Sequence, residues 1–173
     1  MSIEEKESLL GSDKKFIIFS PHSDDFVIGC WNLIKNGKVK MVVYCGFDED
    51  AEAEEGMRRF CKDFGIELKE VEYETMIDFV YGGNVDLGND VLLFPSQNDH
   101  HPAHKLIGSL FNLFAFDGMK CGLYSIDMNV EWIRVVDDWR EKYDILNKYF
   151  PTKKDLWESD KKYVLFEGVV VNV

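Results

Sequence analysis

Short apolar stretches alternate with amphipathic stretches along this chain. Residues 16–19 and 91–94 are wholly apolar, which is typical of strands buried on both faces of a sheet. Strands are predicted at 15–20, 38–45, 66–71, 91–95, 123–129 and 163–173. Helices, where apolar residues recur at helical spacing, are predicted at 26–35, 51–64, 102–116 and 137–149. Residues 74–81 are ambiguous.

Glycine and proline mark the ends of several of these elements. Gly37 and Gly65 stand where a helix cap requires left-handed backbone, and Pro102 stands in the first turn of a predicted helix. The strand–helix alternation predicts a three-layer α/β/α sandwich with a mostly parallel sheet. With 173 residues, 46% of them apolar, the chain is predicted to form one domain over 1–173.

Polar side chains with catalytic potential follow the first and fourth predicted strands. His22, Asp24 and Asp25 come directly after strand 15–20. His101 and His104 come after strand 91–95. In an open parallel sheet, the loops that follow two such strands become neighbours where the chain reverses direction across the sheet. The five side chains are therefore predicted to meet at the carboxyl edge of the sheet.

Two imidazoles and one carboxylate form a three-ligand site for zinc or a similar divalent ion. The adjacent carboxylates of Asp24 and Asp25 fit this chemistry if one binds the metal and the other acts as a base. The three-residue spacing of His101 and His104 puts both near one helix face, so one can bind metal while the other faces substrate. Structural alternatives are a hydrogen-bonded histidine and an aspartate that caps a helix. Because all four histidines of the chain lie in the two loops, we favour a metal site.

Composition narrows the choice of compartment and partners. A net charge of −12 disfavours nucleic acid and anionic membranes as partners. The four cysteines are far apart in apolar surroundings, as expected for buried thiols in a reducing compartment. The sequence contains no signal peptide pattern and no run long enough to span a membrane. We therefore expect a cytoplasmic protein with a small-molecule substrate, which can also form oligomers.

The two loops carry a specific resemblance to a known family. The sequence PHSDD at 21–25 resembles the PHPDD signature of the PIG-L/LmbE-like family of zinc-dependent N-acetylglucosaminyl deacetylases. The sequence DHHPAH at 99–104 looks like the second signature of that family, an HPDH-type element after a strand. The order of elements between the two motifs, and the segment 148–152, are similar as well. The resemblance implies a Rossmann-like fold over most of the chain.

The resemblance also implies a role for each site residue. Zinc, with Fe²⁺ as another candidate, is held by His22, Asp25 and His104. Asp24 is the general base for the attacking water, and His101 stabilises the oxyanion or protonates the amine. The implied reaction removes the acetyl group from an N-acetylated amino sugar or glycoconjugate and releases acetate.

The chain departs from the family pattern at three positions near the motifs. Ser23 replaces a proline, Phe26 replaces a glutamate, and Ala103 replaces the aspartate between the two histidines. That aspartate would be expected to orient or charge the neighbouring imidazole, so Asp99 or Asp127 would have to replace it beside His101.

Two other functional classes remain open at this level. A catalytically silent sugar-binding protein with the same fold is compatible with Phe26 and Ala103. A phosphoacceptor receiver domain also has an acidic pair after its first strand, but it has no use for His101 and His104.

Overall fold

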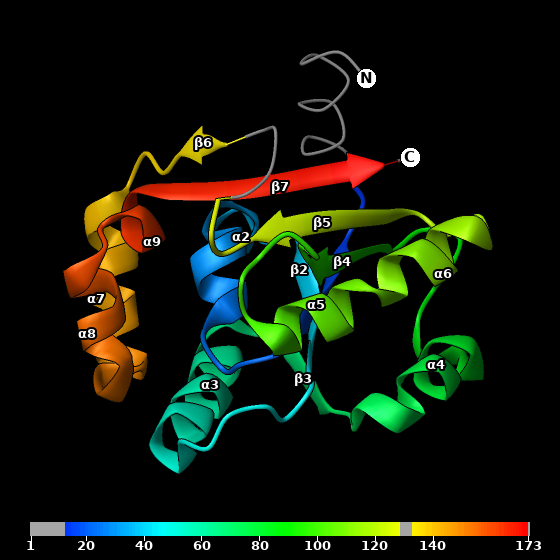
Figure 1. Cartoon of the computed structure of the whole chain (residues 1–173), viewed down its shortest axis with the longest axis horizontal. Helices are drawn as coiled ribbons and strands as arrows, with labels where there is room; N and C mark the ends of the chain where they lie inside the picture. Colours follow the sequence, from blue (N-terminus) through cyan, green and yellow to red (C-terminus); the bar gives the residue numbers. More distant parts are fainter. Residues whose placement is uncertain (1–12, 129–132, 173) are drawn as a thin grey trace.

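The computed structural model describes residues 13–128 and 133–172, which form a central sheet flanked by helices (Figure 1). The strands are β1 (Phe16–Ser20), β2 (Val39–Tyr44), β3 (Glu67–Glu70), β4 (Val91–Pro95), β5 (Cys121–Ser125), β6 (Arg134–Val135) and β7 (Phe166–Asn172). The helices are α2 (Asp25–Lys35), α3 (Ala51–Phe64), α4 (Met76–Phe79), α5 (Pro102–Gly108), α6 (Leu110–Phe116), α7 (Trp139–Tyr149), α8 (Lys154–Ser159) and α9 (Lys162–Leu165). Shorter helical turns are η1 (Tyr73–Thr75), η2 (Val80–Asn84) and η3 (Pro151–Lys153).

The sheet has the strand order β3-β2-β1-β4-β5-β7-β6. The first five of these strands run parallel, and β7 pairs antiparallel with both β5 and β6. The order 3-2-1-4-5 is that of a Rossmann fold and differs from the 2-1-3-4-5 order of receiver domains. The chain reverses direction between β1 and β4, so the loops after these two strands lie side by side. The topology therefore argues against the receiver alternative.

Alternate residues of β1 point into two separate cores. Phe16 and Ile18 face a core shared with α2, α3 and the α7–α9 helices. Ile17 and Phe19 face a second core, to which α4, α5 and α6 contribute. Figure 1 shows these two groups of helices on the two sides of the sheet. The predicted α/β sandwich with a mostly parallel sheet is confirmed, and wholly apolar strands are its signature because both faces of each strand are covered.

Several helices and strands have boundaries in the structure that differ from those predicted from the sequence. The helix predicted at 102–116 is divided at Ser109, whose hydroxyl bonds back to the carbonyl oxygen of Leu106 at 2.6 Å. The fifth strand covers Cys121–Ser125 instead of 123–129, of which residue 129 lies outside the described residues. The final strand begins at 166, after a helical turn that the apolar pattern did not distinguish from strand, and its predicted end at 173 is not described.

Among the described residues, no helix combines the length and the apolar character that crossing a membrane requires. The end of β1 and the end of β4 define the part of the sheet edge where the predicted site residues lie.

Candidate metal and hydrolase site

The loop after β1 is folded by its own polar side chains. The hydroxyl of Ser20 donates to the carbonyl oxygen of His22 at 2.7 Å and accepts the N–H of Phe26 at 3.2 Å. Oδ2 of Asp25 accepts the backbone N–H of His22 at 2.9 Å and lies 2.9 Å from His22 Nδ1. The turn thereby brings the carboxylate of the first helical residue back against the imidazole.

The loop after β4 is organised by a fully buried carboxylate, that of Asp99. It accepts hydrogen bonds from the hydroxyl of Ser125 at 2.6 Å and from the backbone N–H groups of Ile126 and Asp127 at 3.0 and 3.2 Å. Its Oδ2 also lies 3.1 Å from Nδ1 of His104. Asp99 thus ties the β4 loop to the end of β5 and turns Nε2 of His104 toward the β1 loop.

Three ligand atoms from the two loops converge. Nδ1 of His22 lies 3.2 Å from Nε2 of His104, and Oδ2 of Asp25 lies 2.9 Å and 3.0 Å from these two nitrogens. His101 is close to them, and the ligand atoms of His22, His101 and His104 all lie within 4.8 Å of one another. The three histidines therefore form a group that can hold a metal ion.

The carboxylate and the imidazoles of this cluster stabilise each other's charged forms. Burial alone would raise the pKa of the Asp25 carboxyl, but His104 and His22 outweigh it and hold that pKa well below its usual value. Burial alone would lower the pKa of His104, but Asp25 and Asp99 raise it to about 10. The pKa of His22 is raised against the same burial, mainly by Asp25. Asp25 is thus an anion that attracts cations to this point.

Asp24 has a different environment from its neighbour Asp25. It precedes the first residue of α2, but its side chain makes no capping hydrogen bond, which excludes the structural role considered above. Its Oδ1 lies 3.2 Å from the ammonium nitrogen of Lys153. Burial, together with the charges of Asp25 and Asp48, raises the pKa of the Asp24 carboxyl to about 6, although Lys153 acts in the opposite direction.

His101 lies at the N-terminal cap of α5, where its Nδ1 accepts the backbone N–H of Ala103 at 3.2 Å. Burial and the neighbouring His22 and His104 lower the pKa of His101, so its neutral form is favoured. This form carries its proton on Nε2, because Nδ1 acts as an acceptor. Among the described residues, neither Asp99 nor Asp127, the candidate replacements for the missing family aspartate, hydrogen-bonds His101, although the charge of Asp127 acts weakly to raise its pKa. Asp99 pairs with His104, and Asp127 lies 3.0 Å from Nδ1 of His100.

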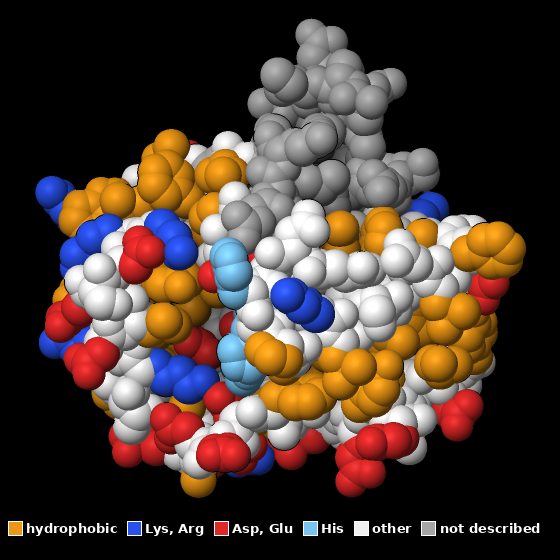
Figure 2. Space-filling view, viewed as in Figure 1, with side chains coloured by type: hydrophobic (Ala, Val, Ile, Leu, Met, Phe, Trp, Pro, Cys, Tyr) orange, Lys and Arg blue, Asp and Glu red, His pale blue; other side chains and the backbone are white. Residues whose placement is uncertain are grey.

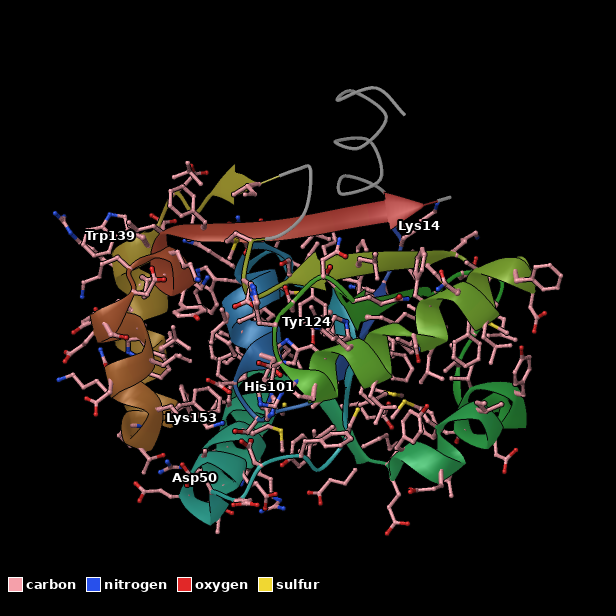
Figure 3. All side chains as sticks on the ribbon, viewed as in Figure 1. Lys14, Asp50, His101, Tyr124, Trp139 and Lys153 are labelled. Atoms are coloured by element: carbon pink, nitrogen blue, oxygen red, sulfur yellow. The ribbon has the colours of Figure 1, made fainter. Side chains whose placement is uncertain are left out.

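The cluster lies on the wall of a pocket of about 480 Å³. The pocket is lined by charged and polar residues from both loops, by Lys153, and by the apolar side chains of Pro102, Ile126, Leu156 and Tyr163. Figure 2 shows histidine side chains beside a hollow between the α7–α9 helices and the α5 side of the molecule. His101 and Lys153 reach this region from different elements (Figure 3).

The structure brings all five predicted site residues to this pocket, namely His22, Asp24, Asp25, His101 and His104. Sequence reasoning missed the partnership of Asp99 with His104 and the contribution of Lys153. The PHSDD motif did not indicate Lys153, which lies 129 residues from Asp24. Phe26, where the family has glutamate, is fully buried with its ring 5.4 Å from that of Phe60, so it serves the core.

Comparison with known proteins adds no assignment: the chain matches no family model and no curated protein.

Proposed function

We propose that this protein is a zinc-dependent hydrolase that removes the acetyl group from an N-acetylated amino sugar or a related conjugate. The observation that carries the proposal is the convergence of His22, Asp25 and His104 within 3.2 Å on a pocket that also presents Asp24 and His101. The resemblance of both loop sequences to the PIG-L/LmbE-like family supports the same reaction.

The three converging atoms suit a small divalent cation. Tetrahedral zinc with bonds of about 2.0–2.1 Å to nitrogen and oxygen requires ligand atoms roughly 3.3 Å apart. The three distances between His22 Nδ1, Asp25 Oδ2 and His104 Nε2 are 2.9, 3.0 and 3.2 Å. A donor set of two imidazoles and one carboxylate is used for zinc and also for Fe²⁺. Asp99 completes the arrangement, because it holds the second nitrogen of His104.

The remaining polar residues have complementary roles in amide hydrolysis. Zinc bound at this site supplies a Lewis acid. Asp24 accepts the proton of the attacking water and passes it to the leaving amine. The Nε2–H group of His101 donates a hydrogen bond to the acyl oxygen as negative charge develops there. A neutral imidazole is sufficient for this role.

The size and walls of the pocket fit a monosaccharide derivative. Its volume of about 480 Å³ falls within the range of ordinary small-molecule sites. Ile126, Leu156 and Tyr163 contribute apolar surface to the pocket lining, against which the face of a sugar ring can pack. Asp127 and His100 at the same pocket provide hydrogen-bonding groups for hydroxyls.

Metal analysis combined with an amine-release assay tests this proposal. Protein treated with chelator and reloaded with zinc should bind one zinc per chain and release equal amounts of acetate and free amine from N-acetylglucosamine or its glycosides. Chelation should abolish the release. Zinc binding without turnover of any acetylated amino sugar would favour the sugar-binding alternative, and failure to bind zinc would refute the proposal.

A further inference from the structure

The carboxylate of Asp24 is hydrogen-bonded by Lys153, which lies 129 residues later in the sequence. Its Nζ lies 3.2 Å from Asp24 Oδ1, and among the described residues it is the one side chain that hydrogen-bonds this carboxylate. The Asp24 side chain is only 4% exposed and lies near the carboxylates of Asp25 and Asp48. Lys153 therefore places a cation against a carboxylate that is almost completely shielded from solvent.

Lys153 is itself anchored by the loop that follows β2. Its Nζ donates to Asp48 Oδ1 at 2.5 Å, and Asp48 Oδ2 accepts the backbone N–H of Ser23 at 2.6 Å. Asp48 therefore bridges the lysine to the residue directly before Asp24. The neighbouring Thr152 donates its hydroxyl to Asp50, which caps α3. These bonds fix the short η3 turn, and with it the position of the ammonium group.

The contact between Lys153 and Asp24 involves one of the two carboxylate oxygens. Lys153 bonds to Oδ1 of Asp24, and both residues line the pocket. A carboxylate held at one oxygen has its rotation restricted, and the other oxygen remains available as a proton acceptor. The Lys153 side chain is 19% exposed, and two carboxylates already share its charge, so a substrate anion would have to compete with them.

We propose that Lys153 is a positioning residue for Asp24, with Asp48 as its anchor. This inference rests on the proposed function, because it assigns Lys153 to the base of that reaction. The ammonium group holds the Asp24 carboxylate at Oδ1 and directs its free oxygen to the water that attacks the acetamide.

The test compares Lys153→Met, Lys153→Arg and Lys153→Met combined with Asp24→Asn in the full-length zinc-loaded protein. A hydrogen bond between charged groups contributes about 1.5–3 kcal/mol, so Lys153→Met should lower kcat for N-acetylglucosamine roughly 10- to 100-fold without changing KM. Lys153→Arg should recover most of kcat because it retains the charge. In the Asp24→Asn background, Lys153→Met should cause no further loss. Lys154→Met is the matched control, since Lys154 pairs with Glu158 on an exposed face and should leave kcat unchanged.

A second readout does not depend on turnover. Urea unfolding of the metal-free proteins should show that Lys153→Met destabilises the wild type more than it destabilises the Asp24→Asn variant, because the two side chains interact. Additive effects on stability would overturn the contact, and additive effects on kcat or a selective rise in KM would overturn the positioning role. A wild type that binds zinc but releases no amine would instead refute the proposed function, while the stability comparison would still report on the Lys153–Asp24 pair.

Discussion

Two of the buried charged clusters among the described residues lie beside α2, and they are built on different principles. One is the site cluster at the start of the helix, formed by His22, Asp25, Asp99 and His104. The other lies at the middle of the helix, where Cys30 departs from helical geometry with φ −133° and ψ 25°. We call this second group of side chains, Lys142 and Glu167, the kink cluster.

The kink cluster satisfies the backbone of the bent helix. The N–H of Asn32 donates to Glu167 Oε2 at 3.1 Å, and the carbonyl oxygen of Ile28 accepts from Lys142 Nζ at 2.6 Å. In a straight helix these two backbone groups would bond to each other. Lys142 also donates to the carbonyl oxygen of Phe166 at 3.3 Å. Each charged group here has a backbone partner, and neither residue lines the site pocket.

The site cluster has the opposite character. Two imidazole nitrogens and a carboxylate oxygen face the same point, an arrangement that only protons or a cation can satisfy. It also opens on a pocket, whereas Lys142 is fully buried. Burial of charge alone therefore does not point to a metal or ligand site, whereas acceptor atoms that converge next to a cavity do.

We expect the largest change in kcat from substitution of the two adjacent aspartates of the site, which should differ in their effect on zinc binding. Asp24→Asn should retain zinc but lower kcat for amine release by roughly two to four orders of magnitude, because it removes the base and leaves the ligands in place. Asp25→Asn should lose zinc as well as activity. Zinc content and steady-state kinetics of the two variants check this, and equal metal loss in both would contradict the division of roles.

The next effect concerns the kink cluster. Lys142→Met should lower the free energy of unfolding by about 2–4 kcal/mol, because it removes the two hydrogen bonds that the ammonium group donates to the buried carbonyl oxygens of Ile28 and Phe166. Burial lowers the pKa of Lys142 to about 8, with Glu167 and Cys30 acting against that shift, so the lysine is still charged at neutral pH. Urea unfolding at pH 7 provides the measurement. Zinc stoichiometry of the folded variant should stay at one per chain, and a selective loss of zinc would link the two clusters.

A smaller effect, on zinc affinity, is expected from substitution of Asp99, the carboxylate beside Nδ1 of His104. Asp99→Asn should weaken zinc binding roughly 10- to 100-fold, as is typical when the partner of a metal-binding histidine is altered. Asp127→Asn is the matched control, because Asp127 pairs with the exposed His100 outside the ligand set. Competition with a zinc-binding dye gives the affinities. Equal weakening by both substitutions would argue against a specific role for Asp99.

The last prediction concerns the pH dependence of zinc affinity. The pKa of His104 is raised to about 10 in the metal-free protein, so at neutral pH this imidazole must lose a proton before it can bind zinc. The apparent affinity should therefore fall as pH is lowered from 8 to 6, by roughly tenfold per pH unit for each proton released. Affinity that is independent of pH in this window would contradict the release of a proton from His104 on zinc binding.

Much of the fold follows from local sequence patterns. Strands β1 and β4 match their predicted ranges closely because wholly apolar runs next to polar loops leave few alternatives. The cap at Gly65 has the expected left-handed φ of 65°. The division of helix 102–116 at Ser109 and the late turns α8 and α9 were missed, since short helices depend on tertiary packing more than on intrinsic preference.

The residue types of the candidate site and the two loops that carry them could be predicted from the sequence, because a strand followed by a polar turn specifies its own local geometry. The pairing of side chains across these loops depends on the tertiary structure. Asp99 serves His104 instead of His101, and Lys153 reaches Asp24 across 129 residues of chain. Such pairings depend on strand order and on the packing of η3 and α8 against the sheet edge, and no local pattern in the sequence encodes these distances.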